Sequence, residues 1–210
     1  VFKLMYKYSQ AIGSINKAIE LNPENSDHLS EYGFILLKVE KTKDAQKVFE
    51  KTLKTNPYDV NAGIALSNMY IKDKRFEDAE NILMKLFEAD TLSSYIARNI
   101  GVSIYLQGDK LSIEWFKRAV LLDSTDVKAY KYLFSAYTIK EDFDSAFAVI
   151  NKAKQVDPYN KSLYTMEGDI HVLRNHNFRA IPVYLKAFEI DPKDEDLPRK
   201  DFFKRCGSQA

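Results

Sequence analysis

Five segments of the chain have closely similar sequences, and this internal repetition constrains the fold more than any other feature. They are AIGSINKAIELNP, AQKVFEKTLKTNP, AENILMKLFEADT, AFAVINKAKQVDP and AIPVYLKAFEIDP, starting at residues 11, 45, 79, 146 and 180. The starting points are evenly spaced, except that the interval between Ala79 and Ala146 is nearly twice as long as the others. A constant period of about 34 residues is typical of stacked structural units.

The long interval between Ala79 and Ala146 contains one further copy of the segment. SIEWFKRAVLLDS, residues 112–124, has Ser112 in place of the alanine and Ala119 seven residues later. This copy is one residue short, and the loss falls in the turn around residues 108–111. The repetition therefore continues in phase through the middle of the chain.

Each repeat is predicted to contain two helices. In residues 127–160, Tyr130, Leu133 and Tyr137 follow helical spacing, and the pattern resumes at Phe143 after a short break. Proline follows most of the second helices and ends them, because it lacks an N–H and restricts the preceding residue. The sequence thus predicts pairs of antiparallel helices.

The pattern resembles the tetratricopeptide repeat family over nearly the entire chain. The unit of that family carries glycine or a small residue in its first helix, and alanine, an aromatic, a second alanine and proline in its second. Gly33, Gly101 and Gly168 stand at the glycine position, whereas Ser67 and Phe134 depart from it. The resemblance implies an all-α fold, a right-handed superhelical α-solenoid of antiparallel helix pairs, with five complete repeats and a partial N-terminal one.

The register of the resemblance divides the chain. Residues 1–25 are expected to be a partial N-terminal repeat, 26–194 five tandem repeats, and 195–210 a short C-terminal cap or tail. The five repeats are residues 26–59, 60–93, 94–126, 127–160 and 161–194. Both ends look incomplete, which favours an excerpt of a longer array over an end covered by a partner or a second copy. Pro182 lies early in its second helix, so we expect that helix to start late or bend.

The composition is that of a globular protein without a strong overall charge. Hydrophobic residues make up 45% of the chain and charged residues 29%, and 31 basic against 30 acidic side chains leave a net charge of +1. This balance argues against nucleic acid as a partner, although a basic groove would favour single strands. The longest apolar run, residues 146–150, is far too short to span a bilayer, so no membrane span is expected.

The sequence contains no recognisable catalytic constellation. His28, His171 and His176 are not spaced as zinc ligands, and the scattered glycines form no phosphate-binding loop. The single cysteine, Cys206, cannot form an internal disulfide. We therefore expect no enzymatic activity, metal or cofactor. A cytoplasmic location is slightly favoured, although a processed or truncated N-terminus would hide targeting information.

The resemblance also implies a binding surface. In tetratricopeptide arrays the first helices line the concave face, and positions 2, 5, 6, 9, 12 and 13 of each repeat are available to a bound peptide. On this map the third and fourth repeats supply a basic region rich in tyrosine. The candidate peptide-binding groove consists of Asn68, Tyr95, Arg98, Asn99, Tyr105, Lys128, Lys131 and Tyr132.

Some members of the family clamp the terminal carboxylate of a peptide with five polar positions. This chain matches three of them, Asn68, Asn99 and Lys128, while Ile64 and Tyr132 replace two basic residues. Each lost charge-assisted donor removes about 1.5–3 kcal/mol, so the chaperone-tail specificity of those members is not expected. Binding of an acidic or extended segment is one interpretation, and simple packing or solvation of these side chains is the other.

The sequence favours a non-enzymatic scaffold for protein–protein interaction, which binds a peptide or a partner helix in the concave groove. Two alternatives stay open. One is a structural scaffold that assembles into a homo-oligomer. The other is an accessory tetratricopeptide segment of a larger multidomain protein or enzyme. The identity of the partner does not follow from the fold.

Overall fold

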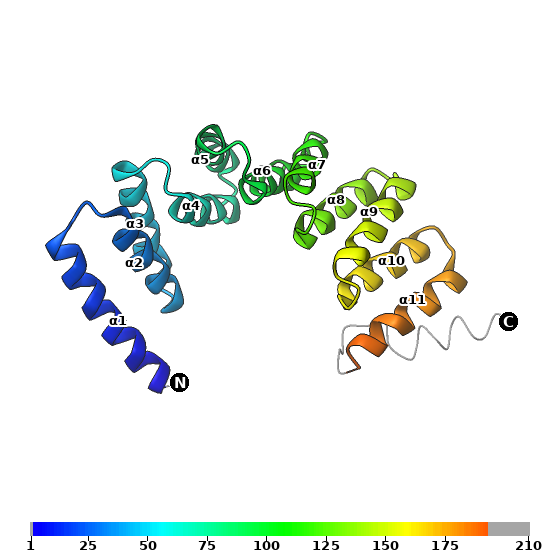
Figure 1. Ribbon diagram of the computed structural model, residues 1–210, viewed down its shortest axis with the longest axis horizontal. Coiled ribbons are helices and arrows are strands. Elements are labelled where there is room, and N and C mark those ends of the chain that lie inside the picture. Colours follow the sequence, from blue (N-terminus) through cyan, green and yellow to red (C-terminus); the bar gives the residue numbers. More distant parts are fainter. Residues whose placement is uncertain (1, 193–210) are drawn as a thin grey trace. The chain divides into compact units, whose positions relative to one another are not determined.

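The computed structural model describes residues 2–192, and the regular structure in this range is entirely α-helical, as predicted (Figure 1). The expected cap or tail at residues 195–210 lies outside the described residues. The helices within the described range are α1 (Phe2–Leu21), α2 (Ser26–Lys38), α3 (Thr42–Thr55), α4 (Val60–Lys72), α5 (Phe76–Ala89), α6 (Ser94–Leu106), α7 (Ser112–Leu122), α8 (Val127–Ile139), α9 (Phe143–Val156), α10 (Lys161–Leu173) and α11 (Asn177–Ile190).

The helices fall into two compact units, which are described separately. Unit 1 ends at Asp109 and contains α1 to α6, and unit 2 begins at Lys110 and contains α7 to α11. In unit 1, α2 packs against α3 and α4 packs against α5, while α4 also contacts both α2 and α6. The helices α2, α4 and α6 therefore form one continuous layer. In unit 2, α8 pairs with α9 and α10 pairs with α11.

The first helices of the pairs begin in a recurrent way. Helices α2, α4, α6, α8 and α10 start at residues 26, 60, 94, 127 and 161, and we propose that each opens one repeat. Asn25, Asp59, Ser93 and Asp126 precede four of them, and the side chain of each accepts a hydrogen bond from a backbone N–H in the first turn. Such N-caps satisfy donors that the helix itself leaves unpaired.

The first helices also end alike. A residue with positive φ, between 59° and 79°, follows each of them, and these residues are Glu40, Lys74, Gly108, Glu141 and Asn175. A left-handed residue after a helix turns the chain back and satisfies its last carbonyl groups. The second helix of each pair can therefore begin within a few residues and run antiparallel to the first.

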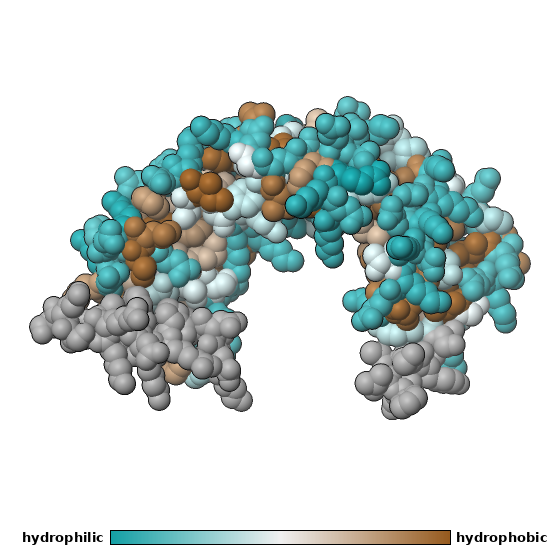
Figure 2. Space-filling model, turned by 180° about the vertical axis from the view of Figure 1, so that it is seen from behind, coloured by the Kyte–Doolittle hydropathy of each residue, from teal (hydrophilic) through white to brown (hydrophobic). Residues whose placement is uncertain are grey.

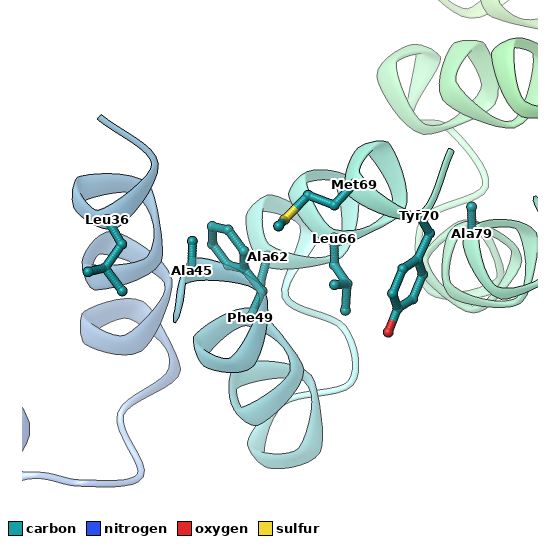
Figure 3. Packing of buried hydrophobic residues seen from close by; sticks show 8 residues of the cluster. All are labelled: Leu36, Ala45, Phe49, Ala62, Leu66, Met69, Tyr70 and Ala79. Carbon is teal, nitrogen blue, oxygen red and sulfur yellow. The ribbon is translucent and has the colours of Figure 1, made fainter. Parts of the chain in front are cut away.

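The core of unit 1 is built between neighbouring helix pairs. Figure 3 shows a cluster to which α2, α3, α4 and α5 all contribute. Its buried members are Leu36, Ala45, Phe49, Ala62, Leu66, Met69, Tyr70 and Ala79. The alanines allow the helices to approach closely, and the larger side chains fill the remaining space. Each pair thus buries its apolar face only because a neighbour is present.

Glycine in a first helix makes room for a ring of the second helix. A Cβ atom at Gly33 would lie 2.4 Å from Cε1 of Phe49, and one at Gly168 would lie 2.5 Å from Cε1 of Tyr184. Ser67 stands at the same repeat position and is buried, and its hydroxyl donates a 2.7 Å hydrogen bond to the carbonyl oxygen of Gly63. The close approach of the helices explains why the glycine position recurs.

The expectation of a late start for α11 is wrong. The helix begins at Asn177, three residues before Ala180, just as α9 begins three residues before Ala146. Pro182 lies inside α11, where it deprives only the carbonyl of Phe178 of a helical partner. Because Phe178 is 79% exposed, this end of the helix is accessible to solvent. One lost bond at a solvated helix end is compatible with a regular start.

We predict that Gly33→Ala destabilises the protein by about 1–3 kcal/mol, because the new methyl group would overlap the ring of Phe49. The matched control is Gly13→Ala. Gly13 lies inside α1 with no atom within 4 Å of the position of a Cβ, so alanine there should stabilise by about 0.5–1 kcal/mol. Urea unfolding followed by circular dichroism measures both changes, and equal stability of the two variants would contradict the packing argument.

His171 of α10 lies in the interface between α10 and α9. Its ring is 4.9 Å from the ring of Phe147. Its Nδ1 atom is buried and has no hydrogen-bond partner among the described residues. A neutral imidazole tolerates this environment better than a charged one, because burial removes the water that would stabilise the positive charge.

Stability is predicted to decrease as the pH is lowered through the ordinary pKa of histidine, about 6.5. Burial lowers the pKa of His171, Glu167 opposes this, and Arg179, His176 and Arg174 lower the pKa further. As the pH falls, His171 is therefore protonated in the unfolded chain before it is protonated in the folded chain. The stability that neutral His171 allows is complete above its ordinary pKa of about 6.5, and it is lost as the pH falls towards the lower pKa of the folded state. Thermal unfolding should show a smaller loss for His171→Gln than for the wild type; an identical pH profile would contradict this assignment.

Candidate functional site

The layer of first helices in unit 1 carries five of the predicted groove residues. Helix α6 is positioned by Ser93, whose hydroxyl oxygen accepts a hydrogen bond of 3.3 Å from the N–H of Ile96. This start places Tyr95 and Arg98 one turn apart on the same side of α6. Because α6 contacts α4, both helices contribute to one surface.

Arg98 and Tyr95 interact directly. The Cζ atom of Arg98 lies 5.1 Å from the centroid of the Tyr95 ring, which is a cation–π contact. Tyr95 is 47% exposed and Arg98 is half-buried. The contact restrains a guanidinium group beside an exposed aromatic ring, so that both can meet a ligand in a defined arrangement.

Asn99 differs from its neighbour Arg98. The sequence assigned both side chains to the candidate groove, but Asn99 is only 9% exposed. Its Nδ2 donates a 2.7 Å hydrogen bond to the carbonyl oxygen of Tyr95. The amide is therefore engaged within its own helix, which satisfies a polar group in a buried position.

Asn68 and Tyr105 complete the set in unit 1. Asn68 lies on α4 and is exposed, and Tyr105 lies near the end of α6 and is half-buried. Ile64, which replaces a basic clamp residue, is 3% exposed and belongs to the packing of α4. This position therefore supplies neither charge nor contact surface.

Helix α8 carries the three groove residues of unit 2. Lys128 is exposed on this helix, whereas Lys131 is half-buried. Burial lowers the pKa of Lys131, the positive charge of Lys128 acts in the same direction, and Asp157 opposes both. The two lysines therefore form a local concentration of positive charge, of which the Lys131 side is partly shielded from water.

Tyr132 has a structural role in addition to its exposed edge. Its ring stacks on Phe116 of α7 with a centroid distance of 5.4 Å and an interplanar angle of 13°. Phe116 is fully buried, and Tyr132 is 36% exposed. The tyrosine that replaces a basic clamp residue therefore also covers the contact between α7 and α8.

The structure brings together Tyr95, Arg98 and Asn99 in unit 1, and Lys128, Lys131 and Tyr132 in unit 2. On the face seen in Figure 2, hydrophobic residues lie in small groups among hydrophilic ones. A surface of this kind suits recognition by a few well-placed side chains.

Metal ions and membranes are two other kinds of partner that a chain can bind. Within residues 2–192, no group of three or more His, Cys, Asp and Glu side chains is arranged to hold a metal ion. In the same range, no helix combines the length and the apolar character that crossing a membrane requires.

Sequence reasoning missed one surface, on α11. Phe178, Leu185 and Phe188 are 79%, 46% and 49% exposed, and Ile181 is half-buried between them. Their spacing of three or four residues between neighbours was a signal of one helix face. It looked like ordinary core packing, because every second helix in the chain carries apolar residues.

Comparison with known proteins identifies the family. Two sequence profiles described as "Tetratricopeptide repeat" match residues 15–47 and 36–98. Together with the helix pairs and the solved structures below, these matches show that the chain is a tetratricopeptide repeat protein. This fold supports protein–protein interaction scaffolds in general.

Two curated proteins are similar in sequence. Anaphase-promoting complex subunit 3 of Schizosaccharomyces pombe is 23% identical over 193 residues, which cover 91% of this chain and 29% of that protein. BBSome complex member BBS4 of Mus musculus is 29% identical over 101 residues, which cover 48% of this chain and 19% of that protein. The chain thus spans less than a third of the length of either relative.

Solved structures share the fold over most of the chain. YrrB is 18% identical with a TM-score of 0.66, and the match covers 92% of this chain and 97% of that one. PilF of Pseudomonas aeruginosa is 14% identical with a TM-score of 0.75, covering 100% and 93%. MamA is 23% identical with a TM-score of 0.67, covering 77% and 95%. At these identities the likeness concerns the fold alone.

The stack of Tyr132 on Phe116 yields a prediction for stability. Tyr132→Ala should destabilise the protein by about 1–2 kcal/mol, because it removes an aromatic pair and exposes Phe116 to solvent. Tyr132→Phe keeps the ring and should change stability little. Tyr159→Ala is the exposed control, since Tyr159 is 80% exposed. If thermal unfolding shows the same loss of stability for Tyr132→Ala as for Tyr159→Ala, the ring of Tyr132 has no packing role.

Proposed function

We propose that the chain is a non-enzymatic scaffold whose first helices bind a peptide or a partner helix. The observation that carries this proposal is the pairing of Arg98 with the exposed ring of Tyr95 on a layer formed by α2, α4 and α6. Tyrosine and arginine are among the residues most often found at the energetic centre of protein interfaces. The pair offers apolar area and charged donors at the same place.

The two groups suit different parts of a peptide. The ring of Tyr95 can pack against an apolar side chain, while the guanidinium of Arg98 can donate to a carboxylate or a backbone carbonyl. Asn68 is exposed on the adjacent helix α4 and adds an amide to the same layer. An extended segment, which presents carbonyl groups along its length, fits such a surface best.

The lysines of α8 favour an acidic partner. Lys131 is half-buried and lies within electrostatic range of Lys128, so an approaching carboxylate would relieve repulsion between two like charges. The gain is larger than at a fully solvated lysine, because water screens a half-buried charge less. We therefore propose acidic side chains or a terminal carboxylate in the segment that binds α8.

Printed descriptions of similar proteins support interaction with other proteins. The structure of YrrB is described as that of a TPR protein with an unusual peptide-binding site, and its fold covers 92% of this chain. Both curated relatives are named as parts of complexes and are longer than this chain. These names favour a second candidate function, in which the chain is the interacting segment of a larger protein within a complex.

The two proposed contact regions, on α6 in unit 1 and on α8 in unit 2, are tested together with the double variant Arg98→Ala, Lys128→Ala. An array of extended acidic dodecapeptides, with basic peptides of matched length, provides the probes. We expect the wild-type chain to prefer acidic peptides, and the variant to bind them at least about tenfold more weakly, because two charged donors are lost. Fluorescence anisotropy of the best acidic peptide measures the dissociation constant.

The matched control is Lys47→Ala, Lys152→Ala. Both lysines are exposed on second helices, so this control removes the same total charge away from the proposed surface. If both double variants lose the same affinity for the acidic peptide, the effect is one of general electrostatics. If Arg98→Ala, Lys128→Ala leaves that affinity unchanged, the proposed binding is refuted. Light scattering over a range of concentrations tests the alternative of a self-assembling scaffold, which predicts an oligomer that persists without peptide.

A further inference from the structure

The exposed apolar stripe on α11 consists of Phe178, Ile181, Leu185 and Phe188. It lies on the helix face that corresponds to the face by which α9 contacts α10. The repeat register aligns Phe178, Ile181 and Phe188 of α11 with Asp144, Phe147 and Lys154 of α9. All three of these α9 residues contact α10 or the turn that follows it. The pairs are Asp144 with Arg174 at 3.4 Å, the rings of Phe147 and His171 at 4.9 Å, and Lys154 with Glu167 at 2.7 Å.

The preceding helix pairs use the same face. In unit 1, Glu80 of α5 aligns with Ile181, and its carboxylate accepts hydrogen bonds from Ser103 and Gln107. Phe87 of α5 aligns with Phe188 but is only 5% exposed, against 49% for Phe188. In α5 and α9, this face of the second helix is thus an interface with the first helix that follows.

We infer that the stripe of Phe178, Ile181, Leu185 and Phe188 on α11 is a docking surface for an amphipathic helix of another protein, which takes the place of a following first helix. An interface already established in this fold continues onto α11, where it is exposed. The surface lies on a second helix and is therefore separate from the proposed peptide-binding layer of first helices.

The side chains on α11 define the chemistry of the docking helix. At the aligned positions α9 presents two charged residues, which pair with Arg174 and Glu167. On α11 the three positions are all apolar, so a helix like α10 would bury unpaired charges against Phe178 and Phe188. The partner helix must carry apolar residues at its own three contact positions, spaced four and then three residues apart.

Unit 1 contains a helix with this pattern. At the positions aligned with Glu167, His171 and Arg174, α2 and the residue after it carry Tyr32, Leu36 and Val39. Helix α2 packs against α1, which carries Ile12 and Ile19 at the positions aligned with Ile181 and Phe188. The contact of α1 with α2 is therefore apolar at two of the three aligned positions, with Ser9 at the position of Phe178, and α2 is a template for the helix that suits α11.

The residues that follow α11 in the chain do not have this pattern in the repeat register. The residues that lie one repeat length after Glu167, His171 and Arg174 are Asp201, Arg205 and Ser208. Their polar side chains would meet the apolar stripe if the register continued. This mismatch favours a helix from another protein as the occupant.

The proposal is tested with two synthetic peptides of equal length, residues 25–40, which contain α2, and residues 160–175, which contain α10. Fluorescein-labelled peptides are titrated with the 210-residue chain. We expect the α2 peptide to bind at micromolar concentration and the α10 peptide to bind at least about tenfold more weakly. Phe188→Lys, a change at a half-exposed position, should weaken binding of the α2 peptide about tenfold or more while leaving the circular dichroism spectrum unchanged.

A triple variant provides a gain-of-function control. Phe178→Asp, Ile181→Phe and Phe188→Lys together give α11 the contact residues of α9, so this variant should prefer the α10 peptide over the α2 peptide. Binding of both peptides without preference, or binding that Phe188→Lys leaves unchanged, would overturn the docking surface. So would failure of the α2 peptide to bind at all.

Two further measurements address the other occupants. A dimer in light scattering that Phe188→Lys dissociates would assign the face to a second copy and overturn the proposal. A nitroxide on Cys206, the single cysteine, reports on the end of the chain. Strong broadening of the amide signals of Phe178 and Phe188 in the free chain would assign the face to the chain itself; unperturbed signals and a monomer are the expected results.

Discussion

The close approach of the two helices in each pair is the constraint on which the rest of the structure depends. Where Gly33 and Gly168 lack a side chain, the rings of Phe49 and Tyr184 fill the space beside the first helix. A ring anchored in this way fixes the distance between the helices. The distance in turn decides which faces remain for the neighbouring pair, so packing inside a pair determines packing between pairs.

The contacts between successive pairs are chemically more varied than those within a pair. The contact of α9 with α10 contains the partly buried ion pair of Lys154 with Glu167, whereas α1 and α2 present apolar residues at the aligned positions. One geometry can therefore accept either polar or apolar partners, provided that the two sides match. Because of this variation, the side chains of a second helix indicate whether a polar or an apolar first helix can follow it. The inference for α11 rests on this relation.

The sequence predicted some features of the candidate site and missed others. The register correctly assigned Tyr95 and Arg98 to a first helix and Lys128 and Lys131 to another, because helix positions follow from the repeat period. It did not predict that Asn99 is buried with its amide bonded to the carbonyl oxygen of Tyr95. Such a bond depends on the surroundings of one side chain, which the period does not describe.

The sequence by itself determined the all-α fold and the pairing of helices, because helical spacing, capping residues and turn prolines act over short distances along the chain. Only the tertiary structure decided which side chains are accessible. Tyr132 stacks on Phe116, and Phe188 is exposed although the aligned Phe87 is buried. Burial depends on whether another helix covers a residue, and that is a property of neighbours in space rather than of the residues themselves.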